Sequence, residues 1–316
     1  MTKSSTLRLH DGAGRRFGIA LLCVLPCAAA QASSAHLFTE GFEKPAGTSA
    51  ISYLSGRGWY DLSNPTIVTD EKYAGTSSLA YTINQGQTAN GGMRLQIPDL
   101  KTVYLRYARR YPTSFLWPAP NYGPHDFHVW ANASQYQPPT SVPFAFYVEQ
   151  CSRTVNGVRR DGIAHLQTKD AAGNYTGYDD PQLATVFTGG AWHVVDAMIR
   201  MNDPGEANGE FSMSVDGVER IERTGLTFDS GSGSMLFNQL FFGPYFHQGA
   251  SQTQTFWTDN IIISDAPIAE APVPMPGWVL PLGSGMLGAF ARLRLRPPRH
   301  VDSGGAPNFS KSVPPH

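Results

Sequence analysis

The chain has 316 residues, a formal net charge of −1 at pH 7 and only 16% charged residues, and this length suits one large domain or two small ones. No basic run lies between the two ends, which argues against nucleic acid as a partner. A polyanion could still bind locally, because Arg106, Arg109 and Arg110 are clustered.

The N-terminus has the three parts of a secretory signal peptide, which we expect to occupy residues 1–32. Four basic residues precede the apolar run FGIALLCVLPCAAA, which leads into the small-x-small site AQA. We expect cleavage after Ala32, and therefore a protein that is secreted or associated with the cell surface. Cys27 leaves a lipid anchor as an alternative, but Pro26 stands where such a signal has a small residue.

Cysteine usage shows how the mature chain is stabilised. Cys23 and Cys27 lie in the signal segment, so only Cys151 remains after cleavage. An intramolecular disulfide and a cysteine zinc cluster are then excluded. The domain needs a conventional apolar core, and we expect Cys151 to be a buried strand residue.

Residues 36–266 are rich in strand signals and are predicted to form one all-β domain. Short runs of β-branched and aromatic residues alternate with turn residues, and apolar residues nowhere recur at helical spacing for three turns. The expected architecture is a sandwich of two antiparallel sheets. The runs are TVYLRYARRY, VPFAFYVEQC, IAHLQTK, WHVVDAMIRM, EFSMSVDG, MLFNQLFFGPY and FWTDNIIIS.

Several predicted strands carry one apolar face and one face that mixes aromatic and polar groups. Alternation places Asp126, His128 and Trp130 together, and Tyr147 together with Glu149. Two packed sheets need only one apolar face each. The mixed faces therefore suit a groove for a sugar chain, and the alternative is an ordinary solvated surface.

The acidic stretch NDPGEANGE, which begins at Asn202, is predicted to be a hairpin connection rather than a metal site. Pro204-Gly205 and Asn208-Gly209 can supply the fixed and positive φ angles of turns. Its spacing lacks the alternating oxygen ligands of a calcium loop. Further along, Asp216-Gly217 predicts a two-residue hairpin turn of type I′.

The C-terminal tail divides into a proline-rich linker (267–276), an apolar segment with an arginine cluster (277–300) and a disordered end (301–316). The apolar run is shorter than the ~20 residues that a membrane-spanning helix needs. The tail resembles the PEP-CTERM sorting signal of exported bacterial proteins, with VPMP at the motif position. The resemblance implies a sorting machinery as partner and only transient membrane contact. The motif lacks its Glu, and residues follow His300, so a disordered tail is the alternative.

The C-terminal half of the domain resembles the concanavalin A-like lectin/glucanase jelly rolls, above all the branch that contains the family-14 polysaccharide lyases. The resemblance covers about residues 187–264 and is carried by GGAWHVVDAMIRMNDPGEANGEFSMSVDG, FNQLFFGPYF and FWTDNIIIS. FTEGFEKP also resembles the first strand of such domains. The resemblance implies an exported jelly roll that cleaves or binds an extracellular polysaccharide, such as an exopolysaccharide.

A polysaccharide lyase must remove a proton α to a uronate carboxyl group, protonate the leaving oxygen and neutralise the carboxylate. Arg106 is the candidate neutraliser. The candidates for the acid and the base are His128, Tyr147 and Tyr245, with His125 as a further one. The candidate substrate-binding residues are Arg110, Trp130, Glu149, Gln150 and Gln239.

The family's catalytic Lys, in a G-K-x-P-G segment, has no counterpart here. The chain has no Lys between Lys101 and Lys169, and PAPNYGPHDF stands in its place. Either His128 and Tyr147 have replaced the acid/base pair, or the domain binds glycan without cleaving it and its aromatic residues stack on sugars. A retaining hydrolase ranks third, because no paired strand carboxylates are present.

The same class of jelly roll often holds a structural calcium ion between its first and last strands. Here Glu40, Glu43 and Asp259 could supply the oxygen ligands. The alternative is that Asp259 and Asn260 only bond the strand ends. No cofactor is expected to be required for the chemistry.

Overall fold

The computed structural model describes residues 36–118, 124–170, 172–229 and 235–269. These residues belong to one compact unit that ends at Ala269. The predicted signal peptide and the predicted sorting tail beyond residue 269 lie outside the described residues. No helix among the described residues is long and apolar enough to cross a membrane.

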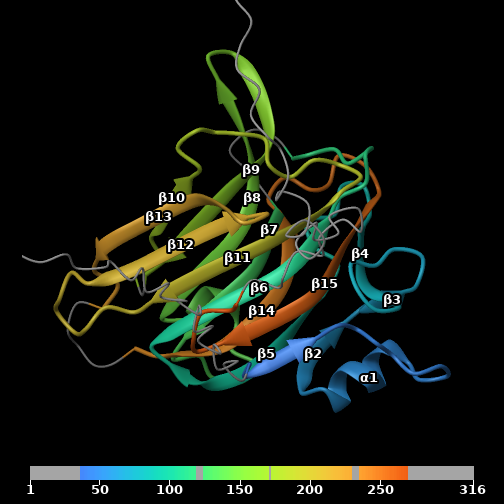
Figure 1. Cartoon of the computed structure of the whole chain (residues 1–316), viewed down its shortest axis with the longest axis horizontal. Helices are drawn as coiled ribbons and strands as arrows, with labels where there is room; N and C mark the ends of the chain where they lie inside the picture. The colour runs from blue at the N-terminus through green and yellow to red at the C-terminus, as the bar shows by residue number, and fades with distance from the viewer. Residues whose placement is uncertain (1–35, 119–123, 171, 230–234, 270–316) are drawn as a thin grey trace, which may run out of the picture. The chain divides into compact units, whose positions relative to one another are not determined.

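The strands form two antiparallel sheets stacked face to face, as predicted (Figure 1). The first sheet has the order β13 (Val218–Leu226), β12 (Gly209–Val215), β11 (Trp192–Arg200), β6 (Thr102–Arg110), β15 (Gln254–Ser264), β4 (Ser78–Ile83) and β3 (Thr66–Val68), and β1 (Phe38–Glu40) also pairs with β15. The second sheet has the order β10 (Tyr175–Asp179), β9 (Val158–Lys169), β8 (Phe144–Val155), β7 (Pro124–Ala131), β14 (Phe237–Phe246), β5 (Gly92–Leu100) and β2 (Trp59–Ser63).

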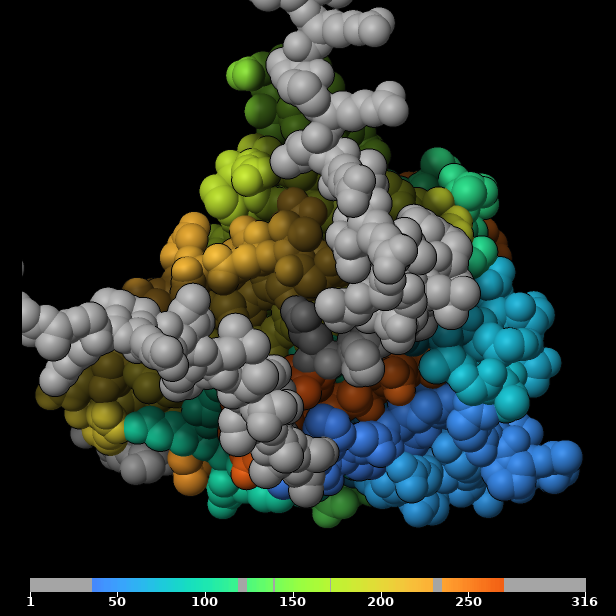
Figure 2. Space-filling model, in the orientation of Figure 1, coloured from blue at the N-terminus to red at the C-terminus, as the bar shows by residue number. Residues whose placement is uncertain are grey.

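Helical structure among the described residues is short. The α-helix α1 (Ala50–Gly56) begins after Ser49, whose side chain accepts a hydrogen bond from the Ser52 N–H at 3.1 Å. A single 3-10 turn, η1, covers Pro139–Ser141. In Figure 2 the segment that contains β1 and α1 is blue and lies beside β15 in red-orange, in agreement with the pairing of β1 and β15.

The two sheets differ in how their outer faces are covered. In β11 every second residue is buried, so that Val195, Ala197 and Ile199 point into the core and the intervening side chains lie outside. In β7 every residue is buried, and β8 is buried from Phe144 to Ser152. The outer face of the second sheet is therefore partly covered, and this face carries the candidate site.

A buried ion pair joins Arg109 of β6 to Asp126 of β7 between the two sheets. The Arg109 guanidinium bonds both oxygens of Asp126, one of them at 3.1 Å. The Gln150 amide donates to Asp126 at 3.4 Å and to the Tyr107 hydroxyl at 3.3 Å, and its oxygen accepts from Tyr111. These hydrogen bonds are what allow two opposite charges to remain in the core.

The position of Asp126 corrects the predicted face of β7. Strict alternation placed Asp126 with His128 and Trp130, but the register against β8 shifts between His125 and Phe127. This β-bulge turns His125 outward and Asp126 inward. His125 and His128 therefore share the outer face, although they are three residues apart.

The acidic loop is a connection between β11 and β12, as predicted. Asn208 closes it, because its side-chain oxygen accepts from the Asp203 N–H at 2.8 Å and its amide donates to Asp203 at 2.7 Å. Gly205 has a φ of 79°. Gly209 does not have a positive φ, and it is needed because an added Cβ would lie 2.8 Å from the Leu226 carbonyl oxygen.

Two smaller predictions are also confirmed. Asp216 and Gly217 have φ angles of 54° and 74°, the pair of positive values that a type I′ turn requires. Cys151 is a free, buried strand residue.

Candidate functional site

A groove of about 710 Å³ lies on the outer face of the second sheet. Five strands line it: β7, β8, β9, β10 and β14, together with η1 and the segments that follow Gln87 and Phe246. Its polar side chains include His125, His128 and His247. The volume falls within the range of ~300–1,000 Å³ that is usual for ligand sites.

The strand register explains why the groove residues meet. His128 on β7 pairs with Tyr147 on β8 and with Phe241 on β14, and Tyr147 pairs with Gln167 on β9. Residues directly opposite each other in antiparallel strands lie on the same face. The rings of His128 and Tyr147 consequently lie 4.3 Å apart between centroids.

A second row of side chains crosses the same sheet. Its first contact is Asp179 Oδ1 to His165 Nδ1 at 2.7 Å, and His165 Nε2 then lies 3.9 Å from Glu149 Oε2. Glu149 bonds His125 Nδ1, and His125 Nε2 contacts His247 Nε2 at the groove wall. Carboxylates and imidazoles thus alternate from the edge of the sheet to the groove, and the three in the middle, His165, Glu149 and His125, are buried.

The environment sets the protonation of the two residues that face each other in the groove. Burial, reinforced by His125 and Arg94, holds the pKa of His128 well below 6.5, so this imidazole is neutral at pH 7. Neither of its ring nitrogens has a hydrogen-bond partner. Burial, together with Tyr175, raises the pKa of Tyr147, which therefore keeps its proton. A neutral imidazole and a protonated phenol can act as base and acid.

Positive side chains are close to the groove but do not line it. Among the described residues that line it there is no Arg or Lys. The Arg94 guanidinium is packed against Trp130 and Phe241, 5.0 and 5.1 Å from the ring centroids. Lys169 donates to the carbonyl oxygens of Thr140 and Val142 at 3.0 and 3.2 Å, and so holds the segment before β8.

Arg106 and Arg110 are not part of this site, contrary to our prediction. Both lie on β6, on the outer face of the first sheet. Arg106 pairs with Asp196 at 2.5 Å, and Arg110 pairs with Glu71 at 3.2 Å. The prediction failed because the sequence does not reveal which sheet a strand joins.

The predicted substrate-binding residues are mostly buried. Trp130 is 0% exposed and packs with Val142 and Ala145, so it cannot stack on a sugar. Gln150 lies in the core, and Gln239 is 0% exposed and donates to the Tyr60 hydroxyl at 2.5 Å. These three assignments are therefore corrected.

Of the predicted residues, the structure brings together His128, Tyr147 and Tyr245, with Glu149 behind His125. Glu149 is only 3% exposed, and it positions His125 rather than contacting a ligand.

Sequence reasoning missed several residues that line the groove, among them His247, Gln167 and Tyr175. Gln167 and Tyr175 lie on β9 and β10, and His247 directly follows β14. Only the register between strands relates them to His128, and no local motif marks them.

The proposed calcium ligands Glu40, Glu43 and Asp259 do not form one carboxylate cluster. A calcium ion needs several oxygen ligands close together. Among the described residues, one group of three His, Cys, Asp or Glu side chains has its ligand atoms within 4.8 Å of one another, and none of the three predicted calcium ligands belongs to it. Each predicted ligand already accepts hydrogen bonds from the protein. Glu40 accepts them from Phe42, Tyr53 and Arg57, and Glu43 accepts them from Thr76. Asp259 accepts them from the backbone N–H groups of Tyr73, Ala74 and Asn260. The residues as placed do not fit a shared calcium ion.

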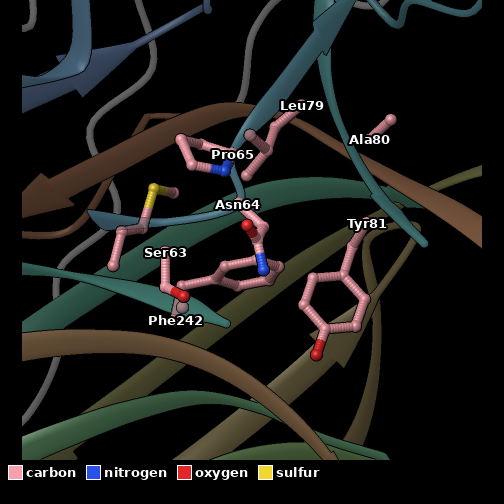
Figure 3. Close-up of a pocket in the computed structure, with 9 residues that line it drawn as sticks. Ser63, Asn64, Pro65, Leu79, Ala80, Tyr81 and Phe242 are labelled. Atoms are coloured by element: carbon pink, nitrogen blue, oxygen red, sulfur yellow. The ribbon is translucent and has the colours of Figure 1, made fainter. Parts of the chain in front are cut away.

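Two other features of the described part do not form ligand sites. The group within 4.8 Å is Cys151, His165 and Asp179, but Arg153 pairs with Asp179 at 2.8 Å and occupies the place of a cation. Figure 3 shows a crevice lined by Asn64, Tyr81 and Phe242, among others. Its volume of about 10 Å³ leaves room for about one water molecule.

Comparison with known proteins gives one family match over part of the chain and several similar folds. The family model described as polysaccharide lyase 14 matches residues 164–260, which extend from β9 into β15. No curated protein matches the chain.

Several solved lyases have a similar fold. A mutant of alginate lyase Aly36B in complex with alginate trisaccharide has 14% identity and a TM-score of 0.53, covering 75% of this chain and 100% of that chain. The PL-14 alginate lyase from Aplysia kurodai has 14% identity and a TM-score of 0.52, covering 73% and 99%. Alginate lyase vAL-1 from Chlorella virus has 13% identity and a TM-score of 0.52, covering 73% and 99%. The described domain therefore has a two-sheet jelly-roll fold similar to that of these lyases, and the polysaccharide lyase 14 model matches part of it.

Proposed function

We propose that the protein is an exported polysaccharide lyase that cleaves a uronate-containing glycan by β-elimination in the groove of the second sheet. The observation that carries this proposal is the contact between His128, a neutral imidazole with two unpartnered nitrogens, and Tyr147, a protonated phenol. The match to polysaccharide lyase 14 over residues 164–260 supports the same reaction class.

The two residues can divide the proton transfers. A His128 ring nitrogen takes the proton from the carbon α to the uronate carboxyl group. The electron pair forms a carbon–carbon double bond, and the bond from the β carbon to the glycosidic oxygen breaks. Tyr147 donates its proton to that oxygen, which leaves as a hydroxyl group, and proton exchange with solvent restores both residues. Each proton transfer typically contributes ~10²–10⁴-fold to the rate.

A second candidate function is glycan binding without cleavage. It is favoured by the lack of the family's catalytic Lys and by the aromatic rings at the groove, where Tyr175 and Tyr245 are 55% and 38% exposed. Exposed aromatic rings can stack on sugar faces. The two functions differ in whether the groove forms a product.

The test is to follow ultraviolet absorbance of the unsaturated uronate while the protein is incubated with alginate, glucuronan or pectate. We expect a rise with one of these substrates, and a loss of at least ~10²-fold in Tyr147→Phe and in His128→Asn. Arg106→Met is the matched control, since Arg106 lies on the other sheet, and it should retain full activity. A flat trace on all three substrates, together with binding of one of them, would establish the second function.

The proposal includes export and handling of the tail by a sorting machinery. It rests on the signal-peptide pattern of residues 1–32 and on the VPMP tail, both read from the sequence. Mass spectrometry of the protein from its native cells should find an N-terminus at Ser33. An intact N-terminus would contradict export by this route.

A further inference from the structure

The wall of the groove contains two imidazoles that face each other through the same ring atom. His125 Nε2 and His247 Nε2 are in contact, and the ring centroids lie 4.5 Å apart. His125 is buried on β7, while His247 follows the end of β14. Segments far apart in the chain therefore direct two nitrogen ligands to one point beside the cavity.

The partner of His125 determines which of its nitrogens carries the proton. Glu149 bonds Nδ1, and a carboxylate only accepts hydrogen bonds, so Nδ1 must hold the hydrogen. The lone pair of Nε2 is then directed at His247. A carboxylate that fixes the tautomer of an imidazole in this way is the usual support of a metal-ligating His.

A second imidazole lies behind the carboxylate, beyond hydrogen-bond distance. His165 Nε2 lies 3.9 Å from Glu149, and its Nδ1 bonds Asp179 at 2.7 Å. Arg153 pairs with Asp179 at 2.8 Å. Glu149 orients His125, so that the Nε2 atom of His125 is presented to the groove in a defined direction.

The charge balance of the groove gives an independent reason to look for a cation. The lining residues that the structure describes include no Arg or Lys, although a uronate brings a carboxylate into the groove. The nearby Arg94 is packed against Trp130, and Lys169 is bonded to backbone carbonyl groups. Without a bound cation, the polar side chains that line the described groove are imidazoles, hydroxyl groups and the Gln167 amide, and none of them carries a fixed positive charge.

We propose that His125 and His247 bind one divalent transition-metal ion at the wall of the groove, with Glu149 as the positioning carboxylate. Two imidazole nitrogens select Zn²⁺, Co²⁺ or Ni²⁺ rather than Ca²⁺, which prefers oxygen ligands. Two protein ligands leave coordination positions open, as in catalytic metal sites. The open positions can accept the uronate carboxylate, and this role rests on the proposed function.

The test is calorimetric titration of the purified full chain with ZnCl₂ alone, and with CoCl₂ alone to record the visible absorption of the bound ion. We expect one ion per chain, and loss of that binding in His247→Ala. Glu149→Gln should weaken binding by about 10–100-fold, because the amide no longer forces the proton onto Nδ1. His36→Ala removes an exposed His outside the groove and is the matched control, with binding unchanged.

Each outcome decides the inference. Absence of binding to the wild-type chain would mean that the two imidazoles share a hydrogen bond and no metal site exists. Binding that survives in His247→Ala would place the ion elsewhere, and would also overturn the proposal. Thermal melting of every variant separates loss of the site from loss of the fold. Glycan cleavage without metal binding would refute only the metal site, whereas metal binding without cleavage would refute only the lyase.

Discussion

Replacing Arg109 by Met tests how much the buried ion pair between Arg109 and Asp126 of β7 contributes to the stability of the domain. Arg109 lies between the sheets and pairs with Asp126, and its guanidinium is 4.9 Å from the ring centroid of Phe256. Methionine keeps the apolar part of these contacts and removes the charge. Asp126 then remains buried, with hydrogen bonds from the Gln150 amide, at 3.4 Å, and from the Tyr107 hydroxyl as its remaining support.

The expected loss of stability is large, because breaking a buried pair by removing one partner costs about 3–5 kcal/mol. For a domain of this size each kcal/mol lowers the melting temperature by roughly 2–4 °C, so a decrease of roughly 6–20 °C is expected. Arg106→Met is the matched control. Its pair with Asp196 lies at the surface, where such pairs contribute about 0–1 kcal/mol.

The assay is urea unfolding of both variants at pH 7 and at pH 5. Burial already raises the pKa of Asp126 above 3.8, and removal of Arg109 raises it further. When the pKa of a group is higher in the folded than in the unfolded state, its contribution to the free energy of unfolding is largest at low pH. That contribution is lost as the pH rises through the pKa of the folded state. The loss in Arg109→Met should therefore be smaller at pH 5 than at pH 7. Equal, small losses for Arg109→Met and Arg106→Met would refute the argument.

Three further predictions concern other parts of the domain. The pKa of His128 lies well below 6.5 in the folded state, so the unfolded chain binds the proton first and the free energy of unfolding falls as the pH drops below about 6.5. His128→Leu should reduce this dependence of the unfolding free energy on acidic pH, and an unchanged dependence would contradict the burial argument. Gly217→Val should cost ~1–2 kcal/mol in unfolding free energy, because Gly217 has a φ of 74°; a neutral result would mean that the turn relaxes. Burial raises the pKa of Cys151, so iodoacetamide should label it only in denaturant, and rapid labelling of the native chain would show an open site.

The class of fold could be predicted because its signals are local. Alternation in WHVVDAMIRM reproduces the buried and outer positions of β11, and Asp216-Gly217 forms the turn that its two residues require. These features depend on neighbouring residues and on backbone sterics. They can therefore be predicted without knowing which strands pair.

The site could be predicted only in part, because its geometry is set by long-range register. His128 and Tyr147 were found, since both lie on aromatic-rich strands, and the pairing of β7 with β8 places them opposite each other. Arg106 looked equally suitable by composition, but β6 belongs to the other sheet. Trp130 was expected to stack on sugar and is instead covered by its neighbours, which a strand pattern does not indicate.

The bulge between His125 and Phe127 decides what a polysaccharide would meet in the groove. Deleting Asp126 would restore simple alternation and leave His125 on the outer face, but Arg109 would lose its buried carboxylate partner. The extra residue therefore allows both imidazoles to face the groove while the neighbouring carboxylate stays in the core. In a strand built this way, one added residue can place a charge in the core without changing which side chains face the groove.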